Sequence, residues 1–157
     1  MNNLILSLVA GLGATLAIGV LSYAEVSLTE VVLLMAPFGA TAVLVFGVPS
    51  SPLAQPKNVI IGHFITASIG IAFSQYVEIT PITLAIATGL GVSAMLITKT
   101  THPPAGANPI LIMASGQGWS FLFTPVLIGA VVIVLVGKAL QLLQSQYLTP
   151  RLNGQKT

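Results

Sequence analysis

Residues 101–111 read THPPAGANPIL, and residues 36–44 read APFGATAVL. Both stretches place proline, glycine and a small polar residue inside an apolar run. Proline in a helix interior costs roughly 3 kcal/mol, because it removes a backbone donor and clashes with the preceding turn. In lipid, the carbonyl groups freed by such a break need partners inside the protein. The two stretches therefore predict two broken helices, each surrounded by protein or by a water-filled cavity.

The rest of the chain has the composition of an integral membrane protein. Of its 157 residues, 55% are hydrophobic and only 5% are charged, whereas about a quarter of the residues in soluble domains are charged. Five bases and three acids are too few to cover a soluble fold of this size. No basic run or aromatic platform predicts nucleic-acid binding. The absence of cysteine excludes disulfides and thiolate metal sites.

Apolar segments cover residues 4–24, 31–48, 58–76, 82–98, 104–116 and 120–137. Since about 20 apolar residues span a bilayer as a helix, we predict an all-α membrane protein. Its six membrane-embedded segments include two, the second and the fifth, that are broken or re-entrant. The first segment lacks the basic start and short apolar core of a signal peptide, so we interpret it as a retained helix. Residues 1–145 form one transmembrane domain, and residues 146–157 form a polar C-terminal tail.

The two broken stretches also align with each other. At an offset of 67 residues, Pro37 and Gly39 fall on Pro104 and Gly106, and further along the same offset places Gly62 on Gly129. This pattern favours an internal duplication. The alternative is that short matches arise by chance among common residue types.

Charge placement predicts how the two repeats are related. If all six segments cross, every base lies on the side of the two termini, and all three acids lie on the other side: Glu25, Glu30 and Glu78. The positive-inside rule then places both termini in the cytoplasm. Three crossings per repeat require an inverted 3+3 arrangement, as in many transporters. If the second and fifth segments are re-entrant, only four helices cross and this charge separation is lost.

The broken helices predict an anion site. A helix that restarts inside the membrane presents unpaired backbone N–H groups and the positive end of its dipole. Proline fits the first turn of such a helix, and helix N-termini bind anions. The predicted substrate site comprises both N-termini and the small polar residues beside them: Pro37, Phe38, Gly39, Ala40, Thr41, Pro103, Pro104, Ala105, Gly106 and Asn108.

Two histidines complete the predicted site. His63 lies in an apolar segment and His102 directly precedes the second break. Ionisable residues inside a membrane are costly and are usually functional, and histidine can donate to an anion or carry a proton near neutral pH. A neutral core histidine remains an alternative for His63, and a capping residue remains one for His102. Candidates for a vestibule that attracts anions are Lys57, Asn58 and Lys99. The alternative role is an interfacial anchor for the two lysines and a helix cap for Asn58.

Nothing in the sequence predicts a metal, a cofactor or an enzyme. Two histidines 39 residues apart, without a third ligand type, make a poor metal site. The phosphate-binding loop and the zinc-protease helix are absent. No two carboxylates fall in one plausible site, because each acid flanks a membrane segment.

Residues 36–63, APFGATAVLVFGVPSSPLAQPKNVIIGH, together with THPPAGAN at 101–108, resemble the HPP family of integral membrane proteins. The family takes its name from the triplet present here as His102-Pro103-Pro104, and the resemblance covers residues 4–140. It implies nitrite transport, which is described for plastid members and cyanobacterial relatives. The residues themselves indicate only permeation of a small anion. Asn108-Pro109 stands where the resemblance leads us to expect Thr-Ala, and Lys57 stands where arginine is usual.

We therefore expect a transporter of nitrite or a similar small anion in a bacterial inner (plasma) membrane. It is multi-pass, with both termini in the cytoplasm. Its expected partners are the anion, the lipid bilayer and a second copy of the chain, with no nucleic acid and no cofactor. The first alternative is a structural or regulatory membrane subunit without transport, in which the breaks serve packing alone. The second is a membrane enzyme, for which a catalytic set of residues is missing.

Overall fold

A computed structural model describes residues 3–28 and 31–148 of the chain. Within these ranges the longer elements are all helices: α1 (Asn3–Ser27), α2 (Pro37–Ala42), α3 (Pro56–Tyr76), α4 (Pro81–Ile97), α5 (Asn108–Ser115) and α6 (Ile128–Leu143). Short helical stretches adjoin or link them: η1 (Val43–Gly47), η2 (Pro52–Ala54), η3 (Pro103–Ala107), η4 (Leu122–Leu127) and η5 (Gln144–Leu148). The predicted all-α fold is confirmed. The predicted tail is helical up to Leu148, and the rest of it lies outside the described residues.

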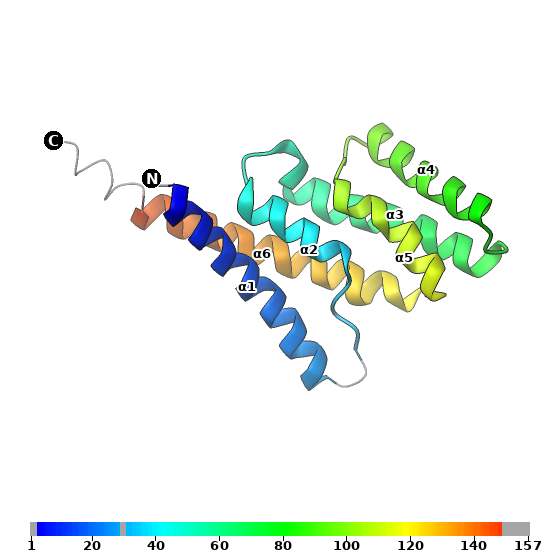
Figure 1. The fold of residues 1–157 in the computed structure, drawn as a ribbon, viewed down its shortest axis with the longest axis horizontal. Coiled ribbons are helices and arrows are strands. Elements are labelled where there is room, and N and C mark those ends of the chain that lie inside the picture. The colour runs from blue at the N-terminus through cyan, green and yellow to red at the C-terminus, as the bar shows by residue number, and fades with distance from the viewer. Residues whose placement is uncertain (1–2, 29–30, 149–157) are drawn as a thin grey trace.

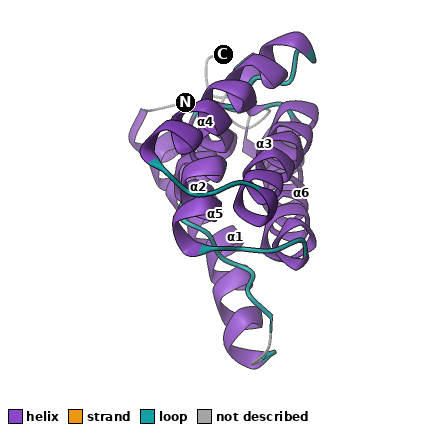
Figure 2. Cartoon of the chain, turned by 90° about the vertical axis from the view of Figure 1, so that its right-hand side faces the viewer, coloured by secondary structure: helices purple, strands orange, loops and turns teal. Residues whose placement is uncertain are grey.

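The six segments run alternately in opposite directions along the bundle (Figure 1). The start of α1 and the end of α6 consequently lie at the same end of the molecule. Helix α3 is central and packs on α4, α5 and α6, whereas α1 packs on α6 at one edge. Figure 2 shows helices joined by loops, with the end of α1 projecting from the bundle.

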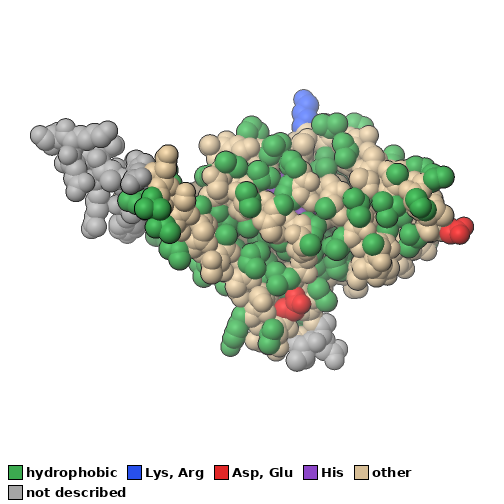
Figure 3. Space-filling view, viewed as in Figure 1, with side chains coloured by type: hydrophobic (Ala, Val, Ile, Leu, Met, Phe, Trp, Pro, Cys, Tyr) green, Lys and Arg blue, Asp and Glu red, His purple; other side chains and the backbone are tan. Residues whose placement is uncertain are grey.

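The lengths and surfaces of the helices are those of a multi-pass membrane protein. Within the described ranges, three helices are long and apolar enough to cross a bilayer: Asn3–Ser27, Pro56–Tyr76 and Leu122–Gln146. The apolar helices Pro81–Ile97 and Pro37–Gly47 are shorter. Hydrophobic side chains cover much of the outer face in Figure 3, and Leu12 is 68% exposed. Such a surface fits contact with lipid rather than with water.

The first predicted break lies directly before Pro37. Residues 31–35 have no helical structure. Helix α2 begins at Pro37, in the first turn, where proline is tolerated, and it continues through Gly39 into η1. A further break, which was not among those predicted, lies at Thr124, with φ −128° and ψ 115°. The α-helical region is disfavoured there because Pro125 follows.

The two halves of the chain have the arrangement of an inverted repeat. In chain order, α1, α2–η1 and α3 correspond to α4, η3–α5 and η4–α6. The members of each corresponding pair run in opposite directions (Figure 1). Their packing corresponds too, because α1 packs on α6 as α4 packs on α3. This brings the two broken segments together, with α2 against η3.

Candidate functional site

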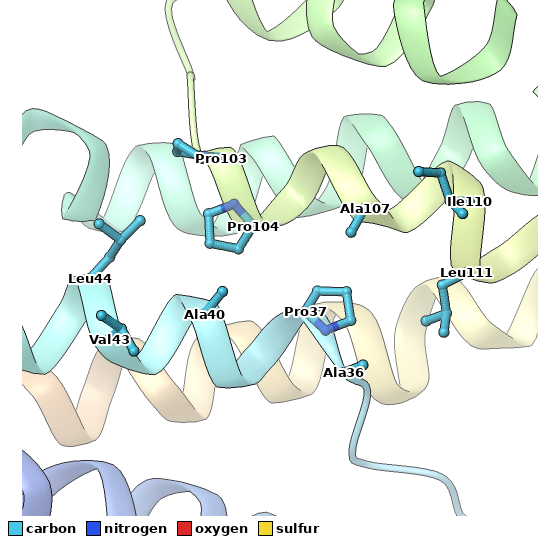
Figure 4. Close-up of a pocket in the computed structure, with 10 residues that line it drawn as sticks. All are labelled: Ala36, Pro37, Ala40, Val43, Leu44, Pro103, Pro104, Ala107, Ile110 and Leu111. Atoms are coloured by element: carbon cyan, nitrogen blue, oxygen red, sulfur yellow. The ribbon is translucent and has the colours of Figure 1, made fainter. Parts of the chain in front are cut away.

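A groove of about 780 Å³ lies between the two broken segments. Figure 4 shows its two walls, in which residues 36–44 and residues 103–111 run antiparallel. Five residues come from each wall: Ala36, Pro37, Ala40, Val43 and Leu44, and Pro103, Pro104, Ala107, Ile110 and Leu111. Each residue of the first wall lies 67 positions before one of the second. The groove therefore follows the internal repeat, and its lining is apolar.

A polar cluster next to these walls joins both broken segments to α3. Its five side chains are Thr41, His63, Thr66, His102 and Asn108, each fully buried. Thr41 comes from α2, His63 and Thr66 come from one face of α3, and His102 and Asn108 flank η3. Apart from His63 and Thr66, these residues are far apart in the sequence. The contact between the two antiparallel broken segments brings them together.

The hydroxyl group of Thr41 is the centre of this polar cluster. Its Oγ1 lies 2.8 Å from Nε2 of His63 and 3.0 Å from Nε2 of His102. The two imidazole rings meet edge to face, with centroids 5.0 Å apart. One hydroxyl oxygen thus connects two imidazoles that belong to different halves of the repeat.

The partners of His102 and His63 determine which ring nitrogens carry hydrogen. Nδ1 of His102 lies 2.8 Å from the carbonyl oxygen of Leu53, which can only accept, so this nitrogen donates. Nε2 of neutral His102 then accepts from Thr41, and because that hydroxyl has one hydrogen, His63 donates to Oγ1 from its own Nε2. This assignment rests on hydrogen-bond geometry. It leaves Nδ1 of His63 as an acceptor.

Asn108 supplies the donor that His63 needs. Its Nδ2 lies 3.0 Å from Nδ1 of His63, 3.1 Å from the carbonyl oxygen of His63 and 3.0 Å from Oγ1 of Thr66. Thr66 in turn donates to the carbonyl oxygen of Gly62 at 2.9 Å. The carbonyl oxygen of His63 fixes the orientation of the amide, since only an N–H can face it. Oδ1 of Asn108 is left buried without a hydrogen-bond partner, an arrangement that is rare in folded proteins.

The structure distributes the other predicted site residues between the groove and its surroundings. Phe38 contacts His63 edge to face at a centroid distance of 5.4 Å, and Ala105 is buried. Gly39 and Gly106 have open space where a Cβ would stand. The groove walls include four predicted residues: Pro37, Ala40, Pro103 and Pro104.

The three predicted vestibule residues lie outside the polar cluster. Lys57 and Lys99 are exposed. Asn58 donates from Nδ2 to the carbonyl oxygen of Thr101 at 2.9 Å, so it holds the loop that precedes His102. Among the described residues, no group of three or more His, Cys, Asp or Glu side chains is placed to hold a metal ion.

The sequence predicted unpaired backbone N–H groups at both helix starts, but three of these N–H groups have hydrogen-bond partners. The N–H of Phe38 donates to the carbonyl oxygen of Met35 at 3.0 Å, and the N–H of Gly39 donates to the carbonyl oxygen of Ala36 at 3.1 Å. The N–H of Ala105 likewise donates to the backbone carbonyl oxygen of His102 at 2.9 Å. Tight first turns satisfy these donors locally, as helix termini often do. Side chains of the polar cluster, rather than these backbone groups, are the polar features of the site.

Thr66 is a member of the polar cluster that the sequence analysis missed. It follows His63 by three residues, a spacing that places both side chains on one face of a helix. That spacing is the signal by which it could have been found. The carbonyl oxygen of Leu53, which orients His102, has no comparable signal in the sequence.

Residues 2–149 match the transmembrane region of the HPP family. The chain belongs to the HPP family. Two curated relatives of this HPP chain are transmembrane proteins of Dictyostelium discoideum. They are 36% and 35% identical to it over 128 residues, which is 76% of the HPP chain and 45% and 41% of the relatives. The chain thus spans less than half the length of these relatives. No solved structure matches it.

The triplet that gives the HPP family its name has two places in the site. His102 belongs to the polar cluster, whereas Pro103 and Pro104 line the groove. The triplet thereby joins the apolar groove to the buried hydrogen-bond network.

Proposed function

We propose that this HPP chain carries a small inorganic anion, with nitrite as the first candidate, across the membrane in which it lies. The observation that supports the proposal is the polar cluster, fully buried in an apolar bundle where both broken segments meet. Ionisable groups inside membrane domains are expensive and mark the pathways of ions and protons. The choice of nitrite rests on the family resemblance.

The chemistry of the polar cluster favours an anion over a cation. Its hydroxyl, imidazole and amide groups provide N–H and O–H donors. No described carboxylate competes with an anion for them, because Glu25 accepts from the backbone of Leu33 and Leu34 at 2.8 Å and Glu78 is exposed. The exposed Lys57 and Lys99 raise the local concentration of anions on their side.

The inverted arrangement supports a carrier rather than an enzyme. In transporters built from inverted repeats, broken segments meet at the substrate site, and one repeat moves relative to the other. The symmetric groove between residues 36–44 and 103–111 provides such a boundary. We place this carrier in the plasma membrane with both termini in the cytoplasm, according to the positive-inside rule.

A structural subunit without transport is the second candidate. This candidate is favoured because nearly all the polar groups of the polar cluster have hydrogen-bond partners within the chain. A satisfied buried network can serve to specify one packing of the helices.

Uptake of nitrite by proteoliposomes that contain only this protein separates the two candidates. Protein-free liposomes are subtracted, because nitrous acid crosses lipid unaided. We expect uptake above that background, and a loss of about tenfold in Thr41→Val, equivalent to one hydrogen bond of roughly 1.4 kcal/mol. Thr88→Val, the same change in α4 where the hydroxyl bonds only to Leu84, is the matched control. Background uptake by the purified protein would favour the structural subunit.

A further inference from the structure

Thr41 has two acceptors within reach of its one hydroxyl hydrogen. Its Oγ1 lies 3.0 Å from Nε2 of His102 and 3.2 Å from the carbonyl oxygen of Pro37. While His102 is neutral, the hydrogen is directed to Nε2. Rotation about one side-chain bond would direct it to Pro37 instead, and Nε2 would then be free to carry a hydrogen of its own.

We propose that the imidazole pair is a proton-binding site and that the protein moves one proton with each anion, an inference that rests on the proposed function. The proton binds to the lone pair of Nε2 of His102, which then donates to Oγ1 of Thr41. The Thr41 hydroxyl donates to Pro37, and His63 continues to donate to Oγ1. A hydroxyl oxygen has two lone pairs and one hydrogen, so it accepts both imidazole donors. Nδ1 of His102 keeps its bond to Leu53, and protonation costs no hydrogen bond.

His63 is less suited to hold the proton. Its free lone pair is on Nδ1, which faces the amide nitrogen of Asn108 at 3.0 Å. A hydrogen there would force the amide to turn, and Oδ1 of Asn108 would then face the carbonyl oxygen of His63. The bond from Nδ2 to that carbonyl would be lost and replaced by two opposed acceptors. The proton therefore belongs on His102.

None of the described charged side chains on the surrounding elements provides a counter-charge for a protonated His102. Lys57 on α3, Lys99 after α4 and Lys138 on α6 are exposed. Of the two described acids, Glu25 holds the backbone after α1, and Glu78 is exposed beyond α3. Among the residues that the structure describes, the titratable group in contact with His102 is the imidazole of His63. A buried charge without a partner is strongly unfavourable, so an entering anion supplies the missing charge, and the two bind together as a neutral pair.

The first experiment measures protons and nitrite together. Proteoliposomes that contain the protein are given a nitrite gradient, the membrane potential is fixed with potassium and valinomycin, and an internal dye reports pH. After subtraction of protein-free liposomes, we expect one proton taken up for each nitrite, and the same uptake at either sign of the potential. Nitrite uptake that follows the potential without proton movement would overturn the proton proposal and leave anion transport intact.

The second experiment detects the proton without transport. Nitrogen NMR of the protein with ¹⁵N-labelled histidine should show, at alkaline pH, hydrogen on Nδ1 of His102 and on Nε2 of His63. As the pH falls in the presence of nitrite, His102 should become doubly protonated, and this signal should be missing in His102→Gln. An imidazolium signal retained in that variant, or none in the wild-type protein while it stays folded, would overturn the proposal.

The same spectra decide the matter if His102→Gln does not fold or if no nitrite uptake is found. At a given acid pH, Thr41→Val should hold less imidazolium than the wild-type protein, because Oγ1 is gone. Thr41→Ser keeps the hydroxyl and should retain the wild-type fraction. Equal fractions in the two variants would contradict the role of Thr41 and the proton site with it. A failure of uptake alone would remove the proposed function and leave the proton site supported by these spectra.

Discussion

Gly62 and Gly129 occupy equivalent positions in the two halves, and each lies against a backbone carbonyl of the neighbouring segment. A Cβ on Gly62 would lie 2.9 Å from the oxygen of Thr100, and a Cβ on Gly129 would lie 3.2 Å from the oxygen of Leu33. Leu33 and Thr100 are themselves 67 positions apart. The internal repeat therefore extends from sequence to a packing contact, in which a helix approaches the chain just before each broken segment.

Gly62→Ala should destabilise the protein. The added methyl would be too close to the carbonyl oxygen of Thr100 and 3.1 Å from Cβ of His102, and overpacking of this kind costs about 1–3 kcal/mol. The melting temperature in detergent should fall. Gly89→Ala in α4 is the control, because its Cβ would meet nothing within 4 Å. It should gain up to about 1 kcal/mol from helix propensity, and equal melting temperatures for the two variants would contradict the packing argument.

Gly106→Ala should leave both folding and nitrite uptake close to wild type. A Cβ on residue 106 would have no neighbour within 4 Å. The N–H of the preceding Ala105 already donates to the backbone carbonyl oxygen of His102. The sequence alone predicts instead that the anion approaches the backbone at this glycine. A folded Gly106→Ala protein that has lost uptake would return the binding site to the helix start.

The sequence was sufficient for the features that follow from composition and local chemistry. A low content of charge indicated the membrane, prolines indicated the breaks, and histidines in apolar surroundings indicated the polar site. It could not show that Thr41 and His102, which are 61 residues apart, share a hydrogen bond, because that contact depends on how the two repeats pack. The pairing of the N–H of Gly39 with Ala36 was also hidden, since a tight and an open first turn have the same residues.

Asn108→Asp should destabilise the protein more than Asn108→Gln, which keeps a side-chain amide at this position. It replaces the donor that faces the carbonyl oxygen of His63 at 3.1 Å by an acceptor, and it buries a charge. The expected loss is at least about 2 kcal/mol in the free energy of unfolding. Gln75→Glu is the matched control: it makes the same chemical change at an exposed amide that donates to Gln117. Similar denaturation curves for the two variants would show that the amide does not hold the polar cluster together.

Glu25→Ala should loosen the chain that leads into α2. The carboxylate oxygen Oε2 accepts from the N–H groups of Leu33 and Leu34, both at 2.8 Å, and bonds to charged groups contribute roughly 1.5–3 kcal/mol each when buried. Glu25 is half-buried, so a total loss of about 2 kcal/mol is expected, and Glu25→Gln, which keeps an acceptor, should lose less. Glu78→Ala at an exposed position should change stability by less than about 0.5 kcal/mol. Hydrogen exchange at Leu33 should be faster in Glu25→Ala, and unchanged exchange would contradict this role.

Cysteine labelling should decide whether six segments or four cross the membrane. The chain has no cysteine, so Asn3→Cys, Lys57→Cys and Glu78→Cys each report one exposed position. Helix α3, with 21 residues, extends for about 32 Å and separates the last two in either arrangement. Six crossings place Asn3 on the side of Lys57, whereas a re-entrant second segment places it on the side of Glu78. With an impermeant maleimide on intact cells, we expect only Glu78→Cys to react, and the other two only after permeabilisation. Labelling of Lys57→Cys alone would establish a re-entrant second segment and rule out six crossings.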